Sequence, residues 1–172
     1  MNQVYTAYLQ PYRAFGGLKK IAQNYFYFEE DFIEDNVRCI PMYVRFKLDG
    51  CGIKLKLSEW SKMSVEERQQ LSAAACTTNK DLLQYRQYLQ QLIIKRTGQP
   101  ATELMIDPAP VWSNIDELPQ QLKEQVAQFS WSISLYQWQA LSNLQRFALV
   151  KLCSSAHENK NLPKAIKEFG LA

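Results

Sequence analysis

The apolar positions of the chain follow two periodicities, one typical of strands and one typical of helices. Two related segments show different periodicities. In residues 42–48 apolar and polar side chains alternate, which is typical of a half-buried strand. In residues 118–128 Leu118, Leu122 and Val126 lie four apart among good helix formers, which is typical of a helix with one buried face. A comparison of the chain with itself resolves the conflict, because it aligns the two segments.

The chain contains an internal repeat, in which Ile40–Leu71 lies over Leu118–Leu149 without a gap at a shift of 78 residues. The matched pairs are apolar anchors, prolines, tryptophans and cap residues: Pro41 with Pro119, Val44 with Leu122, Leu48 with Val126, Trp60 with Trp138, Ser64 with Ser142, and Leu71 with Leu149. Matches at such positions indicate a tandem duplication. Both copies of the first segment are therefore predicted to be helices that begin with proline.

Each half is predicted to hold a helix, an extended piece and a short helix with a tryptophan: residues 41–49, 53–57 and the region of Trp60 in the first half, and 118–128, 131–135 and the region of Trp138 in the second. In both halves an S-x-x-E/Q capping box, at Ser64 and Ser142, starts the next helix. The first half continues with a long helix between the cap Thr78 and Gly98, and the second ends with a shorter helix over residues 162–169.

These elements predict a mainly α fold, with two helical repeats (residues 40–97 and 118–170) packed about a pseudo-twofold axis. The two extended pieces can pair as a short two-stranded β ribbon between the halves. The proline-rich residues 98–117 are predicted to be a linker laid over the surface. Residues 1–25 are predicted to be an N-terminal arm outside the single domain of residues 26–172.

The composition argues against export, membrane insertion and most enzyme classes. No stretch approaches the ~20 apolar residues of a membrane-spanning helix, and prolines and glycines interrupt the N-terminus where an export signal needs an apolar run. The protein is therefore predicted to be cytoplasmic. The single histidine, His157, offers little to a catalytic triad or a two-histidine metal site. It could pair with the nearby Cys153 as a thiolate and imidazole, or lie in a polar turn.

The four cysteines show none of the spacings of a metal or redox site. Cys39, Cys51, Cys76 and Cys153 contain no C-x-x-C pair. In a reducing compartment four free and mostly buried thiols are expected, and no cofactor or metal is predicted.

Positive charge is concentrated in the middle of the chain. Residues 40–98 carry ten basic and five acidic side chains, a net charge of +5, whereas the segments before and after them each carry −1. Such a segment favours an acidic partner surface, or it forms an ordinary solvated face, and its charge is too sparse for a nucleic-acid arm. We predict partner-binding residues on the basic face of the first half: Arg38, Arg45, Lys47, Lys54 and Lys56.

Two short motifs lack the spacing that their chemistry needs. Residues 48–60 are similar to a calcium loop, but Lys47 and Cys51 stand where oxygen ligands should flank Asp49. Gly16-Gly17-Leu-Lys-Lys lacks the spacing of a phosphate-binding loop. Neither motif predicts a calcium or nucleotide site.

Seven stretches resemble the nitrate-reductase-associated protein family of cyanobacteria. They are Arg38-Cys-Ile-Pro-Met-Tyr-Val-Arg-Phe-Lys-Leu-Asp49, Cys51-Gly-Ile-Lys-Leu-x-Leu-x-x-Trp60, Tyr88–Ile93, Arg96–Pro100, Gln137–Leu141, His157–Asn159 and Lys167–Leu171. The resemblance extends from about Phe26 to the C-terminus and leaves only the N-terminal arm outside.

The resemblance implies a non-enzymatic accessory or maturation factor that binds assimilatory nitrate reductase, a cytosolic molybdenum and iron–sulfur enzyme, and supports its activity. It implies no catalytic residues, because none are established for the family. A helical repeat without the groups of a catalytic site agrees with a binding module. Two alternatives stay open: a thiol-dependent carrier of an iron–sulfur or molybdenum species, and a regulatory module that binds nucleic acid. The oligomeric state is open as well.

Overall fold

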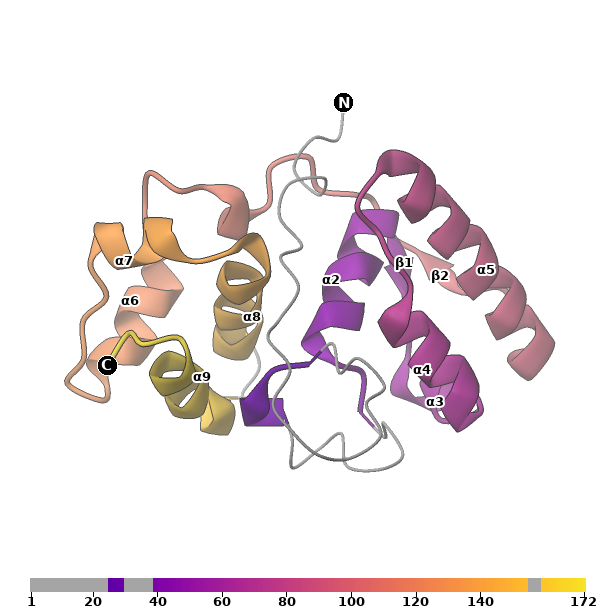
Figure 1. The fold of residues 1–172 in the computed structure, drawn as a ribbon, viewed down its shortest axis with the longest axis horizontal. Coiled ribbons are helices and arrows are strands. Elements are labelled where there is room, and N and C mark those ends of the chain that lie inside the picture. Colours follow the sequence, from indigo (N-terminus) through magenta and orange to yellow (C-terminus); the bar gives the residue numbers. More distant parts are fainter. Residues whose placement is uncertain (1–24, 30–38, 155–158) are drawn as a thin grey trace. The chain divides into compact units, whose positions relative to one another are not determined.

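The structure is a computed structural model that describes residues 25–29, 39–154 and 159–172, and it contains two compact units (Figure 1). Of the described chain, the first unit holds Tyr25, Glu29 and residues 39–108, and the second holds residues 26–28, 109–154 and 159–172. Both units are mainly helical, as predicted. No described helix is long and apolar enough to cross a membrane. Arg38, His157 and the predicted N-terminal arm up to residue 24 lie outside the described residues.

The first unit contains the helix α2 (Met42–Cys51), which is buried on nearly every side. This burial explains why its sequence alternates like that of a strand, because a helix surrounded by other elements needs no continuous polar face. Pro41 precedes the helix, and the left-handed backbone of Gly52, with a φ of 67°, ends it. The prediction of a helix at this position is confirmed.

The other elements of the first unit are β1 (Ile53–Lys54), α3 (Leu57–Trp60), α4 (Val65–Ala73), α5 (Asn79–Thr97) and β2 (Thr102–Glu103). Ser64 caps α4 and Thr78 caps α5, since each hydroxyl accepts a hydrogen bond from the backbone N–H three residues later. Gly98 ends α5 in the left-handed region, with a φ of 76°. These caps confirm the predicted start of α4 and the predicted start and end of α5.

The antiparallel ribbon pairs β1 with β2, so that Ile53 lies opposite Glu103 and Lys54 opposite Thr102. The predicted pairing of β1 with residues 131–135 is therefore wrong. The partner strand comes from residues 98–117, the segment predicted to be a linker. A strand that follows α5 after a few residues reaches β1 by a short loop, and a short loop costs little chain entropy to close.

Gly52 lets the segment after β2 come close to the end of α2. A Cβ at Gly52 would lie 2.7 Å from the carbonyl oxygen of Leu104 and 2.9 Å from Cγ1 of Ile106, whereas a Cβ at Gly98 would meet nothing within 4 Å. Both glycines have a positive φ, so alanine at either position costs about 1–2 kcal/mol through the backbone.

We expect Gly52→Ala to lower the free energy of unfolding by roughly 1–3 kcal/mol more than Gly98→Ala does, because residues 104–106 must also move. Urea titrations of the two variants measure this difference. Equal losses would contradict the close approach at Gly52.

The second unit contains η3 (Val111–Ser113), α6 (Gln120–Ala127), α7 (Leu135–Ala140), α8 (Asn143–Ser154), η4 (Asn159–Asn161) and α9 (Leu162–Glu168). Residues 26–28, which include the first two residues of η2 (Tyr27–Glu29), also belong to this unit. The carboxylate of Glu168 accepts hydrogen bonds from the backbone N–H groups of Tyr27 and Phe28, at 3.0 and 2.9 Å. The rings of Phe26 and Phe28 lie 5.0 and 6.1 Å from that of Phe169.

Arg146 on α8 connects three parts of the second unit, although only 6% of it is exposed. Its Nε donates a hydrogen bond to the carbonyl oxygen of Trp112 at 3.1 Å, and its Nη1 donates to that of Trp138 at 3.5 Å. Its Nη2 donates to the side-chain oxygen of Asn143. Arg146 therefore fixes η3 and α7 to α8.

Taken separately, the two units show the same local features at several of the aligned positions. Trp60 and Trp138 are both fully buried. Each accepts, through its backbone carbonyl, a hydrogen bond from an arginine eight residues later, Arg68 or Arg146. Gly52 and Ser130 both have a positive φ, 67° and 57°. The tandem duplication and the pseudo-twofold packing stay predictions.

Candidate functional site

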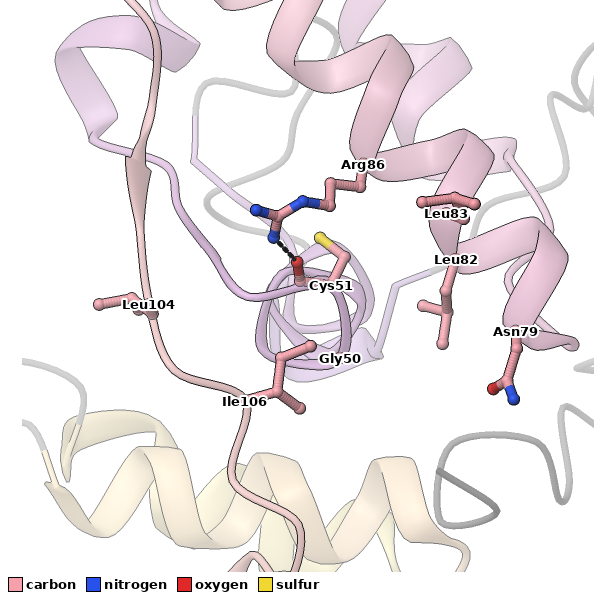
Figure 2. Close-up of a pocket in the computed structure, with 8 residues that line it drawn as sticks. All are labelled: Gly50, Cys51, Asn79, Leu82, Leu83, Arg86, Leu104 and Ile106. Carbon is pink, nitrogen blue, oxygen red and sulfur yellow. Dashed lines mark hydrogen bonds between the residues drawn. The ribbon is translucent and has the colours of Figure 1, made fainter. Parts of the chain in front are cut away.

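The first unit has an open groove between the N-terminal half of α5, the end of α2 and the segment after β2 (Figure 2). Its volume is about 570 Å³. It is lined by Gly50, Cys51, Asn79, Leu82, Leu83, Arg86, Leu104 and Ile106. The lining is mostly apolar, and Leu83 and Leu104 keep 55% and 47% of their surface exposed at the groove.

Arg86 holds one side of the groove together. Figure 2 shows its guanidinium reaching from α5 to the backbone carbonyl of Cys51, to which Nη1 donates a hydrogen bond. Nη1 also donates to the carbonyl of Gly52 at 3.3 Å, and Nη2 forms an ion pair with Glu103 at 2.6 Å. Because these contacts use the charge of Arg86, the groove is suited to an apolar side chain rather than to a free anion.

The thiol of Cys51 lines the groove but is not an active nucleophile. The residue is 3% exposed, and its Sγ donates to the carbonyl oxygen of Leu48 at 3.5 Å. Burial raises the pKa of this thiol to about 12, so that it stays protonated near neutral pH. The residues that line the groove therefore include no activated nucleophile and no catalytic base.

Lys47, one of the predicted partner-binding residues, is buried, with 1% of its surface exposed. Its Nζ donates hydrogen bonds to the carbonyl oxygens of Leu71, Ser72 and Ala74, at 3.1, 2.9 and 2.6 Å. The prediction that Lys47 faces a partner is wrong. An ammonium group at the end of α4 binds the carbonyls that the helix leaves without a partner, and it is attracted by the negative end of the helix dipole.

The surroundings of Lys47 form a buried polar cluster with Tyr43, Cys76 and Tyr85. The ammonium lies 4.0 Å from the ring centroid of Tyr43 and 5.4 Å from that of Tyr85. Burial lowers the pKa of Lys47 to about 8 and raises that of Tyr43 to about 12. In the part of the chain that is described, the Tyr85 hydroxyl is buried without a hydrogen-bond partner. The cluster lies where α2 packs on α4 and α5.

The other predicted partner-binding residues differ from Lys47 in how much of their surface is exposed. Lys54 on β1 and Lys56 just after it are exposed, while Arg45 is half-buried and donates from Nε to the carbonyl of Ile40 at 3.0 Å. Arg38 lies outside the described residues. The structure therefore brings Lys54 and Lys56 together at the surface and leaves Lys47 in the interior.

All four cysteines are free, and they differ in burial. Cys51, Cys76 and Cys153 are buried, whereas Cys39 is half-buried. Burial raises the pKa of the buried thiols to about 12, 11 and 12 respectively.

We expect one thiol, that of Cys39, to react with Ellman's reagent at pH 8 at least about tenfold faster than the other three, because the thiolate is the attacking species. Cys39→Ser should remove the fast phase and leave the slow one. All four thiols should react at once in denaturant. Four equal rates in the native protein would contradict the burial of the three thiols.

The comparison with protein families decides the identity of the chain. A family model described as conserved nitrate reductase-associated protein matches residues 25–169. The chain belongs to this family. The match agrees with the resemblance found in the sequence, and it covers most of both compact units but not residues 1–24 or 170–172. Comparisons with curated proteins and with solved structures gave no match.

Sequence reasoning did not find the groove of this nitrate reductase-associated protein. Arg86 is one of several charged residues in a long helix, and residues 98–117 were predicted to be a linker, so neither was expected to line a groove. One signal was available, because Leu104-Met-Ile106 is an apolar run within this proline-rich segment.

The two alternative functions gain no support from the structure. Within the described ranges, no group of three or more His, Cys, Asp or Glu side chains could hold a metal ion. Three of the four thiols are buried, which does not favour a carrier that must accept and release a cofactor. His157 lies outside the described residues, so a pair with Cys153 stays a prediction.

Proposed function

We propose that this member of the nitrate reductase-associated family is a non-enzymatic accessory factor that binds nitrate reductase in the cytoplasm and supports its activity or maturation in nitrate assimilation. The match of the family model to residues 25–169 carries the proposal. The chemistry of the groove supports it, because an apolar lining with a structurally engaged arginine is suited to binding rather than to catalysis.

The contact surface that we propose combines charge with apolar area on the first unit. Lys54 and Lys56 lie on and beside β1, and the segment after its partner strand β2 carries Leu104 and the 97% exposed Met105. Exposed apolar side chains next to a few charges are typical of interaction sites. The charges would direct an acidic surface of the reductase toward the groove, and the apolar residues would hold it.

A pull-down of the tagged protein from nitrate-grown cells, with metal analysis of the same eluate, tests the proposal. We expect the reductase in the eluate and no metal on the bait once the reductase is removed. Metal retained by the bait alone would favour the carrier alternative. Absence of the reductase under conditions that preserve weak complexes would contradict the proposed function.

Charge reversal tests the contact surface separately. We expect Lys54→Glu with Lys56→Glu to weaken binding of the reductase about tenfold or more, mainly through slower association at low salt. The matched control is Lys62→Glu with Lys80→Glu, two exposed lysines of the same unit whose reversal changes the net charge equally. If both pairs weaken binding to the same degree, net charge and not this surface is responsible.

A further inference from the structure

Residues 131–134 of the second unit occupy the position that β1 has in the first. Each segment follows a helix and a residue with positive φ, Ser130 or Gly52, and each leads into a short helix with a buried tryptophan. The pattern of burial also agrees. Ile53 and Leu55 are buried and Lys54 is exposed, while Trp131 and Ile133 are half-buried and Ser132 is exposed.

The two segments differ in what covers them. In the first unit β2 pairs with β1, and Ile53 is only 1% exposed. In the part of the second unit that is described, no strand pairs with residues 131–134. The helix α9 has seven residues, whereas α5 in the first unit has 19. Residues 131–134 themselves belong to no strand or helix. The N–H of Trp131 donates to the carbonyl oxygen of Val126 at 3.2 Å and that of Ser134 to Oε1 of Gln137 at 2.9 Å, whereas the N–H of Ser132 forms no hydrogen bond with a described residue.

Two exposed aromatic residues flank residues 131–134 in the sequence. Phe129 and Tyr136 keep 40% and 81% of their surface exposed, and the ring centroids of Phe129 and Trp131 are 5.4 Å apart. Exposed tyrosine and tryptophan side chains are common anchors of protein interfaces. A segment with the N–H of Ser132 unpaired among the described residues and with such aromatic anchors is a site at which an extended segment of another chain can add.

The first unit also shows which kind of segment fits. There β2 places Glu103 opposite Ile53, and the carboxylate pairs with Arg86 on the neighbouring helix. In the second unit the exposed Lys167 on α9 has its Nζ 6.0 Å from the ring centroid of Trp131, and it forms no ion pair with a described residue. A carboxylate opposite Trp131 would therefore have a cation within reach.

We propose that an extended segment of nitrate reductase, apolar and with one carboxylate, adds to residues 131–134 as an antiparallel strand, as β2 does to β1. This inference rests on the proposed function, since it names a second contact of the same partner. Main-chain hydrogen bonds to these residues would align the segment, and the aromatic side chains would bury its apolar residues.

The substitution Ser132→Pro tests the proposal, because proline removes the backbone N–H that a neighbouring strand requires. The control is Ser132→Ala, which keeps the backbone and removes only an exposed hydroxyl. We expect Ser132→Pro to reduce recovery of the reductase about tenfold or more and Ser132→Ala to leave it unchanged. Lys167→Glu should reduce recovery, and the conservative Lys167→Arg should not.

A photoreactive phenylalanine analogue at position 136 provides a second measurement that does not depend on how well the proline variant folds. We expect a covalent adduct with the reductase, in which mass spectrometry maps an extended segment. Suppose that the wild-type protein recovers the reductase, that Ser132→Pro recovers it equally well, and that the cross-linker captures none. The inference is then wrong, and the proposed function stands. An adduct only with a second copy of this chain would also overturn the inference. If wild-type protein recovers no reductase, the proposed function and the inference both fail.

Discussion

The substitution Lys47→Glu is expected to unfold the first unit, rather than only to weaken binding of a partner. The ammonium of Lys47 donates to three backbone carbonyls at the end of α4 and is 1% exposed. A carboxylate at this position would face the same carbonyls with no donor. Removal of one partner from a buried charged contact costs roughly 3–5 kcal/mol, which is a large part of the 5–15 kcal/mol that stabilises an ordinary domain.

Urea titration followed by circular dichroism and tryptophan fluorescence measures this loss. Lys54→Glu is the matched control, since it makes the same change of charge at an exposed position of the same unit. Its effect should stay within about 0.5 kcal/mol. A folded Lys47→Glu protein as stable as the control would show that the three hydrogen bonds are not important for folding. Charge reversal at Lys47 should not be used to map partner binding.

The substitution Arg146→Leu is expected to lower the free energy of unfolding of the second unit by about 3–5 kcal/mol. The guanidinium donates to the backbone carbonyls of Trp112 and Trp138 and to the side chain of Asn143, in an interior where water cannot replace it. The leucine would leave the buried carbonyls of Trp112 and Trp138, and the half-buried side chain of Asn143, without this donor. Loss of the contact between η3 and α8 should be visible as a change in tryptophan fluorescence before the main transition.

Arg68→Leu is the comparison for Arg146→Leu, because Arg68 occupies the aligned position in the first unit. Arg68 donates to the carbonyls of Trp60, Ser61 and Met63, but it is half-buried, and Ser61 is exposed. In Arg68→Leu, water can donate to some of the carbonyls that lose the guanidinium. We therefore expect the free energy of unfolding to fall by only about 1–2 kcal/mol. A larger loss for Arg68→Leu than for Arg146→Leu would contradict burial as the cause of the difference.

Local signals in the sequence were sufficient to predict the helices and their ends. Capping boxes at Ser64 and Thr78 and the glycine after α5 act over four or five residues, so their physical chemistry is contained in a short segment. The helix α2 could not be predicted from its own sequence alone, because a helix buried on nearly every side has no amphipathic pattern. It was assigned correctly only because its aligned copy, α6, has one buried face with Leu122 and Val126.

Contacts between distant segments were not predictable in the same way. Lys47 was assigned to the surface because charged residues are normally exposed, and nothing in residues 42–51 shows that the end of α4 lies against it. The pairing of β1 with Thr102–Glu103 likewise depends on the path of the chain after α5. The groove depends on the path of the chain after β2, because Leu104 and Ile106 line it, and for this reason it could not be predicted from the sequence.

The pairing of β2 with β1 has a consequence for dividing the protein into parts. A fragment that ends at Gly98 would contain the whole of the predicted first repeat, yet it would lose the strand that covers Ile53 and the carboxylate that binds Arg86. Such a fragment would expose an unpaired edge and be prone to aggregate. A fragment that ends at Pro108 keeps both, so this proline, rather than the end of α5, is where the first unit ends; residues 26–28 of the second unit would still remain on that fragment.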